Sequence, residues 1–456
     1  MGPSPPYTVF TRVQRRCIVL IVTVAGLFSA LSSQIYFPVL NIPRVNRRQI
    51  LQGIAPTFLG SFADQVGRRP AYSICFVIYI AANIGLALQH NYVALLLLRC
   101  LQSAGSSSTV ALSAAVVADI YPKEERGSSM GVVMAGAFVG PAIGPILGGL
   151  LARYLGWRAI FWCLMILSGL FFLPFLFFFP ETARNVVGNG SRPAPTWSRP
   201  FIHHLRRSRR APVAGAETDD AMRLRRERRS RFRFLNPVQS LSIIFQPRSG
   251  ILLLANGILF AAYTCVMASI PSVFHALYAL DELQIGLCYI SLGTGAAVAS
   301  TTTGRILDAY YRVLAGKTPD NVPIEKARCV VALPMLIAGG LSTLAFAWVL
   351  DLRVHLAAPV TLMFLIGCGV TGALSCAATL LVDLHPRNPG AASASNNFVR
   401  CLLAAGSAAF VDPLLAALGS GWGFTLVALV MLATGVQLPL LALQRGRLGG
   451  LSPANN

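Results

Sequence analysis

The sequence predicts an all-α membrane protein that crosses the bilayer many times. Of its 456 residues, 55% are hydrophobic and only 12% are charged, whereas a soluble domain carries about a quarter of charged residues. The mean hydropathy is +0.62, and long apolar runs follow one another along the chain with polar loops between them. A spanning helix needs about 20 predominantly apolar residues, and most of these runs reach that length.

The net charge of +21 indicates membrane orientation rather than nucleic-acid binding. The basic residues lie between the apolar runs, chiefly in one loop, and no nucleic-acid-binding fold with interleaved basic and aromatic residues is visible. Loops rich in Lys and Arg stay on the cytoplasmic side, so we expect both termini and the loop 182–248 to be cytoplasmic. Nearly all of the ten cysteines stand inside apolar runs, and none forms a Cys-x-x-Cys pair. We therefore predict no disulfide framework, no metal site and no cofactor.

We predict two six-helix halves, at residues 17–181 and 249–443. They are flanked by a polar tail 1–16, a basic linker 182–248 and a tail 444–456. The predicted spans are Cys17–Leu40, Ile50–Phe62, Ala71–Gln89, Tyr92–Ala118, Met130–Leu151, Trp157–Pro180, Gly250–Phe274, Ile285–Arg305, Arg328–Leu350, Leu356–Val382, Ala394–Leu418 and Trp422–Leu443.

The second predicted span is too short to cross a bilayer. Ile50–Phe62 would measure roughly 20 Å at 1.5 Å per residue. Arg44, Arg47 and Arg48 precede it, and an arginine at a helix centre costs about 2.5–3.5 kcal/mol on insertion scales. We therefore expect a stunted second helix with Arg47 and Arg48 near the outer boundary, and poor transport by the chain as written.

A short basic turn follows the second span. Gly60–Pro70 reads Gly-Ser-Phe-Ala-Asp-Gln-Val-Gly-Arg-Arg-Pro. This pattern resembles the loop between the second and third helices of major facilitator superfamily transporters, and the resemblance implies the major facilitator fold. Gly304-Arg-Ile-Leu-Asp308 repeats the Gly-to-Asp spacing at the end of a later span. Such an internal echo fits a transporter built from two related halves.

The same resemblance implies a gate at the inner ends of the helices. In such a gate, ion pairs hold one state of alternating access and break in the other. The alternative is that these residues only cap helices and set the topology. The implied gate residues are Gly60, Asp64, Gly67, Arg68, Arg69, Asp119 and Glu181.

The fourth span carries an arginine that we expect to lie well inside the bilayer. Arg99 and Gln102 share one helical face with Ser103 and Ser106, and an intramembrane arginine is expensive and faces a polar interior. Arg99-Cys-Leu-Gln-Ser-Ala-Gly105 resembles the Arg-x-x-Gln-Gly-x-Gly motif of proton antiporters in this superfamily, with Ser103 in place of the first glycine. The resemblance implies a part for Arg99 in proton coupling. The alternative is a structural arginine bonded to neighbouring carbonyls.

The fifth span carries a glycine stripe with two prolines. A stripe of this kind lets another helix approach closely, and prolines bend a helix locally. The segment resembles the antiporter signature Gly-x-x-x-Gly-Pro-x-x-Gly-Gly, with proline in place of the last glycine. A generic close-packing stripe explains the glycines but not both prolines. The residues concerned are Gly136, Gly140, Pro141, Gly144 and Pro145, followed by Gly148.

The eleventh span carries Asn396-Asn397-Phe-Val-Arg400-Cys. This run resembles fungal twelve-span drug:proton antiporters of the quinidine-resistance type, a group that includes dityrosine and tricarboxylate exporters. We expect Asn256 and Tyr263 of the seventh span to face the same cavity. Tyr36 ends a serine-rich face of the first span, which is either turned to a cavity or suited to close helix packing.

The resemblance implies a secondary transporter that exports a drug, a metabolite or an organic acid against proton entry. Two arginines and no evident acidic residue at mid-membrane suit an anionic substrate. The alternative is a membrane sensor or an inactive transporter, because the second span is incomplete. We find no His cluster, Ser-His-Asp arrangement or phosphate loop, so we do not expect an enzyme. We expect a monomer in the plasma membrane whose partners are substrate, protons and lipid, without nucleic acid.

Overall fold

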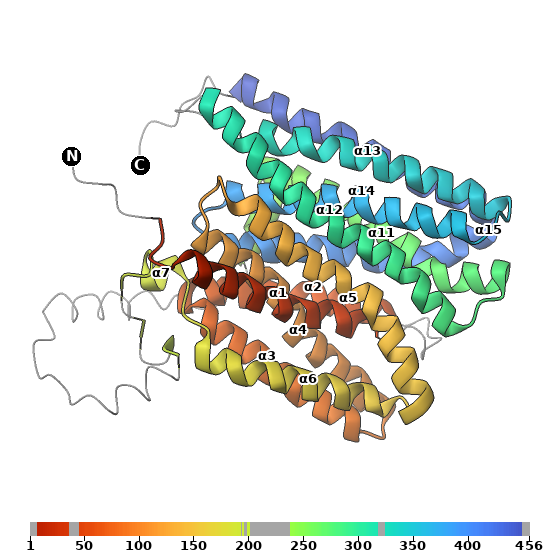
Figure 1. The fold of residues 1–456 in the computed structure, drawn as a ribbon, viewed down its shortest axis with the longest axis horizontal. Helices are drawn as coiled ribbons and strands as arrows, with labels where there is room; N and C mark the ends of the chain where they lie inside the picture. Colours follow the sequence, from red (N-terminus) through yellow and green to blue (C-terminus); the bar gives the residue numbers. More distant parts are fainter. Residues whose placement is uncertain are drawn as a thin grey trace, which may run out of the picture.

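The protein is a bundle of long helices. The computed structural model describes residues 7–35, 45–192, 194–195, 198–200, 238–317 and 324–448, and these contain helices but no strand. Figure 1 shows the two groups of helices side by side. The helices are α1 (Arg12–Gln34), α2 (Val45–Val66), α3 (Arg68–Leu88), α4 (Tyr92–Ile120), α5 (Arg126–Leu155), α6 (Arg158–Phe178), α7 (Arg184–Val187), α10 (Val238–Phe245), α11 (Pro247–Tyr278), α12 (Glu282–Lys317), α13 (Ile324–Asp351), α14 (Ala357–Leu384) and α15 (Pro389–Leu448).

The described helices account for all twelve predicted spans. Helix α15 breaks at Gly419, whose φ of 75° and ψ of 175° are not helical, and so supplies the last two spans. Nine of the described helices are long and apolar enough to cross a membrane, counting α15 once. Helices α2 and α4 complete the set. The prediction of an all-α polytopic membrane fold is confirmed.

The prediction of a stunted second helix is wrong. Helix α2 spans 22 residues, about 33 Å at 1.5 Å per residue, because it continues through polar residues on both sides of the apolar run Ile50–Phe62. Residues such as Arg and Gln are good helix formers, so hydropathy does not mark the ends of this helix. Arg47 and Arg48 belong to its first turn, and nothing is described of their side chains; Tyr36 lies outside the described residues.

Small residues let the two halves approach each other closely. A Cβ added to Gly60 of α2 would lie 2.8 Å from the carbonyl oxygen of Gly390 in α15. Between α5 and α12, a Cβ on Gly304 would lie 3.0 Å from the carbonyl carbon of Gly127. In Figure 1, α5 and α12 run next to each other in the middle of the bundle, with α3 and α6 at one edge and α13 at the other.

The glycine stripe of α5 packs against α1. A Cβ added to Gly140 would lie 2.8 Å from the backbone nitrogen of Leu31, and one added to Gly144 would lie 3.1 Å from that of Ile35. Gly136 and Gly148 meet the backbone of the same helix, and Pro141 and Pro145 lie within α5 without ending it. The stripe is therefore a backbone-to-backbone contact inside the N-terminal half.

We expect Gly140→Ala to lower the stability of the protein. The new methyl group has no room beside α1, and overpacking of this kind costs about 1–3 kcal/mol. The matched control is Gly169→Ala in α6, because a Cβ there meets no heavy atom within 4 Å. Melting temperatures of the two purified variants in detergent test this contact, and equal values would contradict it.

Candidate functional site

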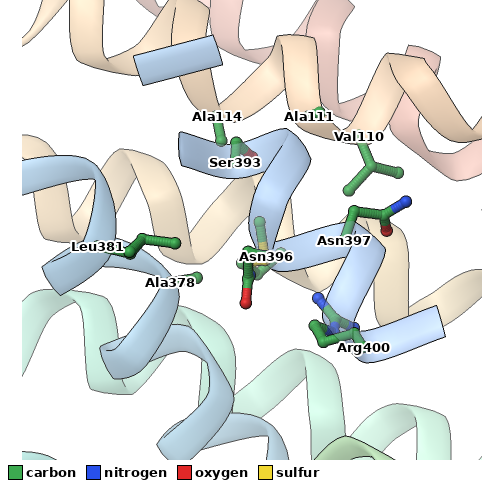
Figure 2. Close-up of a pocket in the computed structure, with 10 residues that line it drawn as sticks. Val110, Ala111, Ala114, Ala378, Leu381, Ser393, Asn396, Asn397 and Arg400 are labelled. Atoms are coloured by element: carbon green, nitrogen blue, oxygen red, sulfur yellow. The ribbon is translucent and has the colours of Figure 1, made fainter. Parts of the chain in front are cut away.

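A small pocket lies between the two halves. Helices α4 and α5 of the N-terminal half and α14 and α15 of the C-terminal half form its walls. In Figure 2 the side chains of α15 lie between those of α4 and those of α14. The lining residues are Val110, Ala111, Ala114, Met134, Ala378, Leu381, Ser393, Asn396, Asn397 and Arg400.

Arg400 is the charged residue among the described lining residues. It lies about 16 Å along α15 from Pro389 at 1.5 Å per residue, which places it deep in the bundle. Its guanidinium carbon stands 3.9 Å from the ring centroid of Phe260 in α11. Its Nε is buried and has no hydrogen-bond partner among the described residues. Arg400 as a whole is half-buried. A cation above an aromatic ring gains about 0.5–2 kcal/mol, so Phe260 compensates part of the cost of withdrawing the guanidinium from water.

The polar residues predicted on α11 and α15 meet beside Arg400. The side-chain amide of Asn256 donates to Oδ1 of Asn396 at 2.5 Å, and both residues are almost fully buried. Tyr263 lies edge-on to Phe138 of α5, with ring centroids 6.3 Å apart, and is tilted against Phe260. Of these residues, Asn396 and Arg400 line the pocket, while Asn256, Phe260 and Tyr263 pack behind them.

The described acidic residues lie away from this pocket. None of the lining residues is acidic. Asp412, the only acidic residue of α15, is exposed and lies about 18 Å along the helix from Arg400 at 1.5 Å per residue. The sequence expectation that no acidic residue stands at mid-membrane thus agrees with the described part of the chain around Arg400.

Arg99 and Gln102 lie in a different place from Arg400. Nη1 of Arg99 donates to Oε1 of Gln102 at 2.9 Å, and the amide of Gln102 donates to Oδ1 of Asn83 at 2.7 Å. The guanidinium of Arg99 also stands 5.7 Å from the ring centroid of Phe161. These partners belong to α3, α4 and α6, so the network lies inside the N-terminal half and outside the pocket lining. Sequence inspection missed Asn83, which stands in an apolar run.

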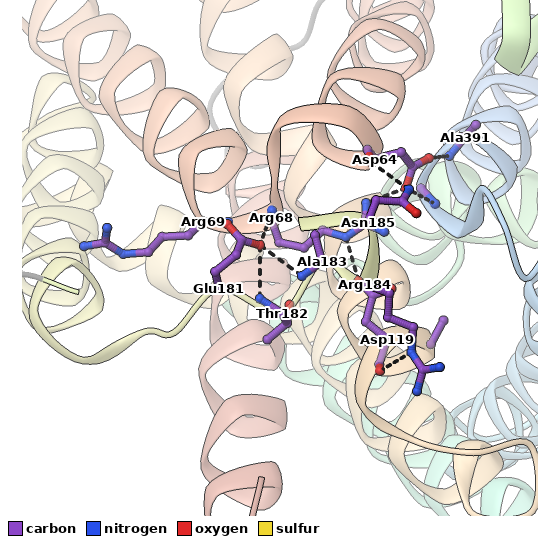
Figure 3. A network of polar contacts seen from close by, with 12 residues as sticks. Asp64, Arg68, Arg69, Asp119, Glu181, Thr182, Ala183, Arg184, Asn185 and Ala391 are labelled. Atoms are coloured by element: carbon purple, nitrogen blue, oxygen red, sulfur yellow. Dashed lines mark hydrogen bonds and ion pairs between the residues drawn. The ribbon is translucent and has the colours of Figure 1, made fainter. Parts of the chain in front are cut away.

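The predicted gate residues come together where α6 ends and α7 begins, here called the α7 end of the bundle (Figure 3). Nη1 of Arg68 lies 2.6 Å from Oδ1 of Asp64, and its Nε lies 2.8 Å from Oδ2 of Asp119. All three side chains are buried. The two carboxylates balance the charge of the buried arginine, whereas removing either partner leaves a costly buried charge.

The carboxylate of Glu181 accepts hydrogen bonds from the start of α3 and from the segment that follows α6. Its Oε1 accepts from the backbone nitrogen of Arg68 at 2.7 Å, and its Oε2 from that of Arg69 at 3.3 Å. The backbone nitrogens of Thr182 and Ala183 also donate to Oε1. Gly67 just before α3 has φ of 127°, and a Cβ there would collide with the Glu181 carboxylate, so this position requires glycine.

Asp64 also joins the two halves. Its carboxylate accepts from the backbone nitrogens of Gly390 at 3.2 Å and Ala391 at 2.9 Å, in the first turn of α15. The first N–H groups of a helix have no partner within the helix, and its N-terminus carries partial positive charge. A carboxylate from the N-terminal half therefore caps a helix of the C-terminal half.

Asp308 makes the reciprocal contact. At the α7 end of α12, its carboxylate accepts from the backbone nitrogens of Gly127 and Ser128 in the first turn of α5, both at 2.7 Å. Gly304 packs against Gly127, as Gly60 packs against Gly390. The two Gly-x-x-x-Asp segments of the sequence thus build the same interaction in opposite directions across the interface.

A third connection was missed in the sequence. Oδ1 of Asp383, at the end of α14, lies 2.5 Å from Nη1 of Arg126, and its Oδ2 lies 3.1 Å from Nη2 of Arg328. All three side chains are buried. Asp383 ends the tenth span as Asp119 ends the fourth, and comparison of the two halves would have drawn attention to it.

Comparison with known proteins places this architecture in a family. The Major Facilitator Superfamily model matches residues 47–408. The chain is 37% identical to MFS-type transporter phiD of Fungal sp. (strain ATCC 74256), over 94% of this chain and 68% of that protein. It is 35% identical to citrate exporter 1 of Aspergillus niger, over 96% and 87% of the two chains.

A solved structure has the same fold. The human organic anion transporter MFSD10 (TETRAN) aligns with a TM-score of 0.66 and 17% sequence identity, over 95% of this chain and all of that one. At this identity the likeness concerns the fold alone. The family model and the fungal relatives carry the assignment: this chain belongs to the major facilitator superfamily and is a multi-pass membrane transporter similar to fungal MFS-type transporters.

Proposed function

We propose that this transporter exports a small organic anion by alternating access, coupled to proton entry. The observation that carries the substrate class is the Arg400 cation in the pocket between the halves, with no acidic residue in the described lining. In a transporter of two related halves, the substrate binds at their interface near the membrane midplane.

The surroundings of Arg400 favour a carboxylate. Hydrogen bonds between arginine and a carboxylate are charge-assisted and often bidentate, and an unpaired buried cation costs several kcal/mol in effective desolvation. The lining residues Val110, Ala111 and Leu381 offer an apolar surface to the body of the substrate, and Asn397 stands close to Arg400 (Figure 2). The similarity to a protein named citrate exporter supports this substrate class.

The contacts at the α7 end supply the switch for alternating access. In the described state Asp64, Asp308 and Asp383 all connect the two halves, so this end is closed. We propose that these contacts break when the other end closes. The predicted topology makes the α7 end cytoplasmic. We propose that the protein is a monomer in the plasma membrane.

The proton-coupling proposal rests on the motif around Arg99. Its hydrogen bonds connect α4 to α3 through Gln102 and Asn83, so a change in this network would alter the packing of two helices that also form the closed end. The alternative of a sensor or an inactive transporter was based on an incomplete second span. Helix α2 has full length, so this reason no longer applies.

Arg400→Gln tests the substrate class. Hydrogen bonds to charged groups contribute about 1.5–3 kcal/mol, so we expect a loss of roughly tenfold to a hundredfold in apparent affinity for anions such as citrate, succinate and benzoate. Neutral and cationic drugs should change little. The measurement is competition against transport in proteoliposomes, with the exposed Arg153→Gln as control. Equal losses for all substrate charges would mean that Arg400 serves the fold.

Arg99→Ala tests proton coupling. We expect the variant to reach the membrane at the normal level and to lose acceleration of transport by a pH gradient, because the hydrogen bond from Arg99 to Gln102 disappears. Arg99→Lys keeps the charge and is expected to restore part of the response. The idea fails if the pH gradient accelerates Arg99→Ala as strongly as the unchanged protein.

Asp383→Asn tests the closed end. The substitution leaves the buried Arg126 and Arg328 without their carboxylate, a loss of about 3–5 kcal/mol for a buried pair. Spin labels are attached at Glu124→Cys and Arg387→Cys, two exposed positions of opposite halves. The distance between the two labels, measured by double electron–electron resonance, should then be longer than in the unchanged protein. The background lacks the exposed Cys17 and the half-buried Cys100, Cys163 and Cys368. Asp281→Asn, exposed on the linker into α12, is the control, and an unchanged distance distribution would refute the switch.

A further inference from the structure

The cation of Arg400 affects the empty transporter as well as the loaded one. To move from one open state to the other, the protein passes through a state in which both ends are closed and water is largely excluded from the pocket. In that state an uncovered guanidinium lies in a medium of low dielectric constant, where an unpaired charge is costly. A bound anion removes most of this cost because its charge cancels that of Arg400.

The described protein offers no carboxylate to take the place of the anion. Asp383 is engaged by Arg126 and Arg328, Asp64 and Asp119 are engaged by Arg68, and all of them lie at the α7 end. The pocket itself contributes amide, methyl, thioether and hydroxyl groups. The ring of Phe260 covers one face of the guanidinium, but the buried Nε keeps no partner.

Transporters driven by protons alone can neutralise a basic residue of the empty closed state in another way. A membrane carboxylate that binds the proton on one side and releases it on the other can pair with a basic residue while the substrate is absent, since its negative charge appears when the proton leaves. This arrangement requires an acidic side chain within reach of the arginine. Around Arg400 the described residues do not contain one.

We propose that the protein acts as an anion exchanger, in which Arg400 carries a carboxylate through the closed state in both directions. This proposal rests on the proposed export of organic anions and adds how the transporter returns to its starting state after each export step. One anion leaves and a second carboxylate of equal charge enters, so one exchange cycle moves no net charge. Net export, in which the empty protein returns, is the slow mode.

The test compares uptake into loaded and empty vesicles. The full chain is reconstituted in proteoliposomes, and labelled succinate or benzoate is added outside. The interior contains either potassium HEPES alone or the same buffer with the unlabelled carboxylate. Valinomycin clamps the membrane potential, so that charge movement does not limit uptake into the empty vesicles. We expect initial uptake at least about tenfold faster into the loaded vesicles.

Variants connect the acceleration to Arg400. Arg400→Gln should transport at similar rates into loaded and empty vesicles, because no charge needs to be covered on the return. Arg400→Lys keeps a cation and should keep the acceleration. Arg153→Gln, an exposed arginine at the end of α5, should behave like the unchanged protein.

The outcomes separate the two proposals. Equal rates into loaded and empty vesicles for the unchanged protein would overturn exchange and leave anion transport standing. The same holds if an acidic interior accelerates uptake into empty vesicles as strongly as the internal carboxylate does. No uptake of succinate or benzoate into any vesicle would overturn the proposed function and exchange together.

Discussion

The two halves are held together by carboxylates placed at the beginnings of helices. Asp64 of α2 caps α15, and Asp308 of α12 caps α5. Each bond satisfies backbone N–H groups that a helix cannot satisfy itself, at a site where the helix dipole favours negative charge. The position of the pocket depends on these contacts, because its walls come from α4 and α5 on one side and α14 and α15 on the other.

Close backbone approach makes the capping possible. A carboxylate on a short aspartate side chain reaches the amides of another helix only if the helices nearly touch, and Gly60 and Gly304 allow this at the two sites. The glycine stripe of α5 applies the same principle within one half, where it meets α1. Helix α5 thus packs closely on both sides, which makes it the element that links the core of the N-terminal half to the interface.

Local motifs were predictable from the sequence, and distant partnerships were not. The segment Gly60–Pro70 drew attention to Asp64 and Arg68 because their types and spacing are contained in one stretch, whereas Asp119 and Glu181 were assigned to the same place through the family resemblance. Asp383 was missed because its partner Arg126 lies 257 positions away. Asn83 is an uncharged residue in an apolar run, and only the contact with Gln102 reveals its part. The length of α2 was misjudged because helix continuity was inferred from hydropathy alone.

The capping contacts have an asymmetric effect on sequence variation. The acceptor must be a short acidic side chain, whereas the donors are peptide N–H groups that every residue except proline possesses. Of the receiving positions, Gly390 and Gly127 require glycine, because an added Cβ would lie 2.8 Å and 2.6 Å from the capping carboxylate oxygens. Ala391 and Ser128 carry side chains and still donate their backbone N–H groups. Substitutions there can preserve the bond while the aspartate cannot change. Because the aspartate stays constant and the donor is a backbone group, a search for co-varying residue pairs would overlook these contacts.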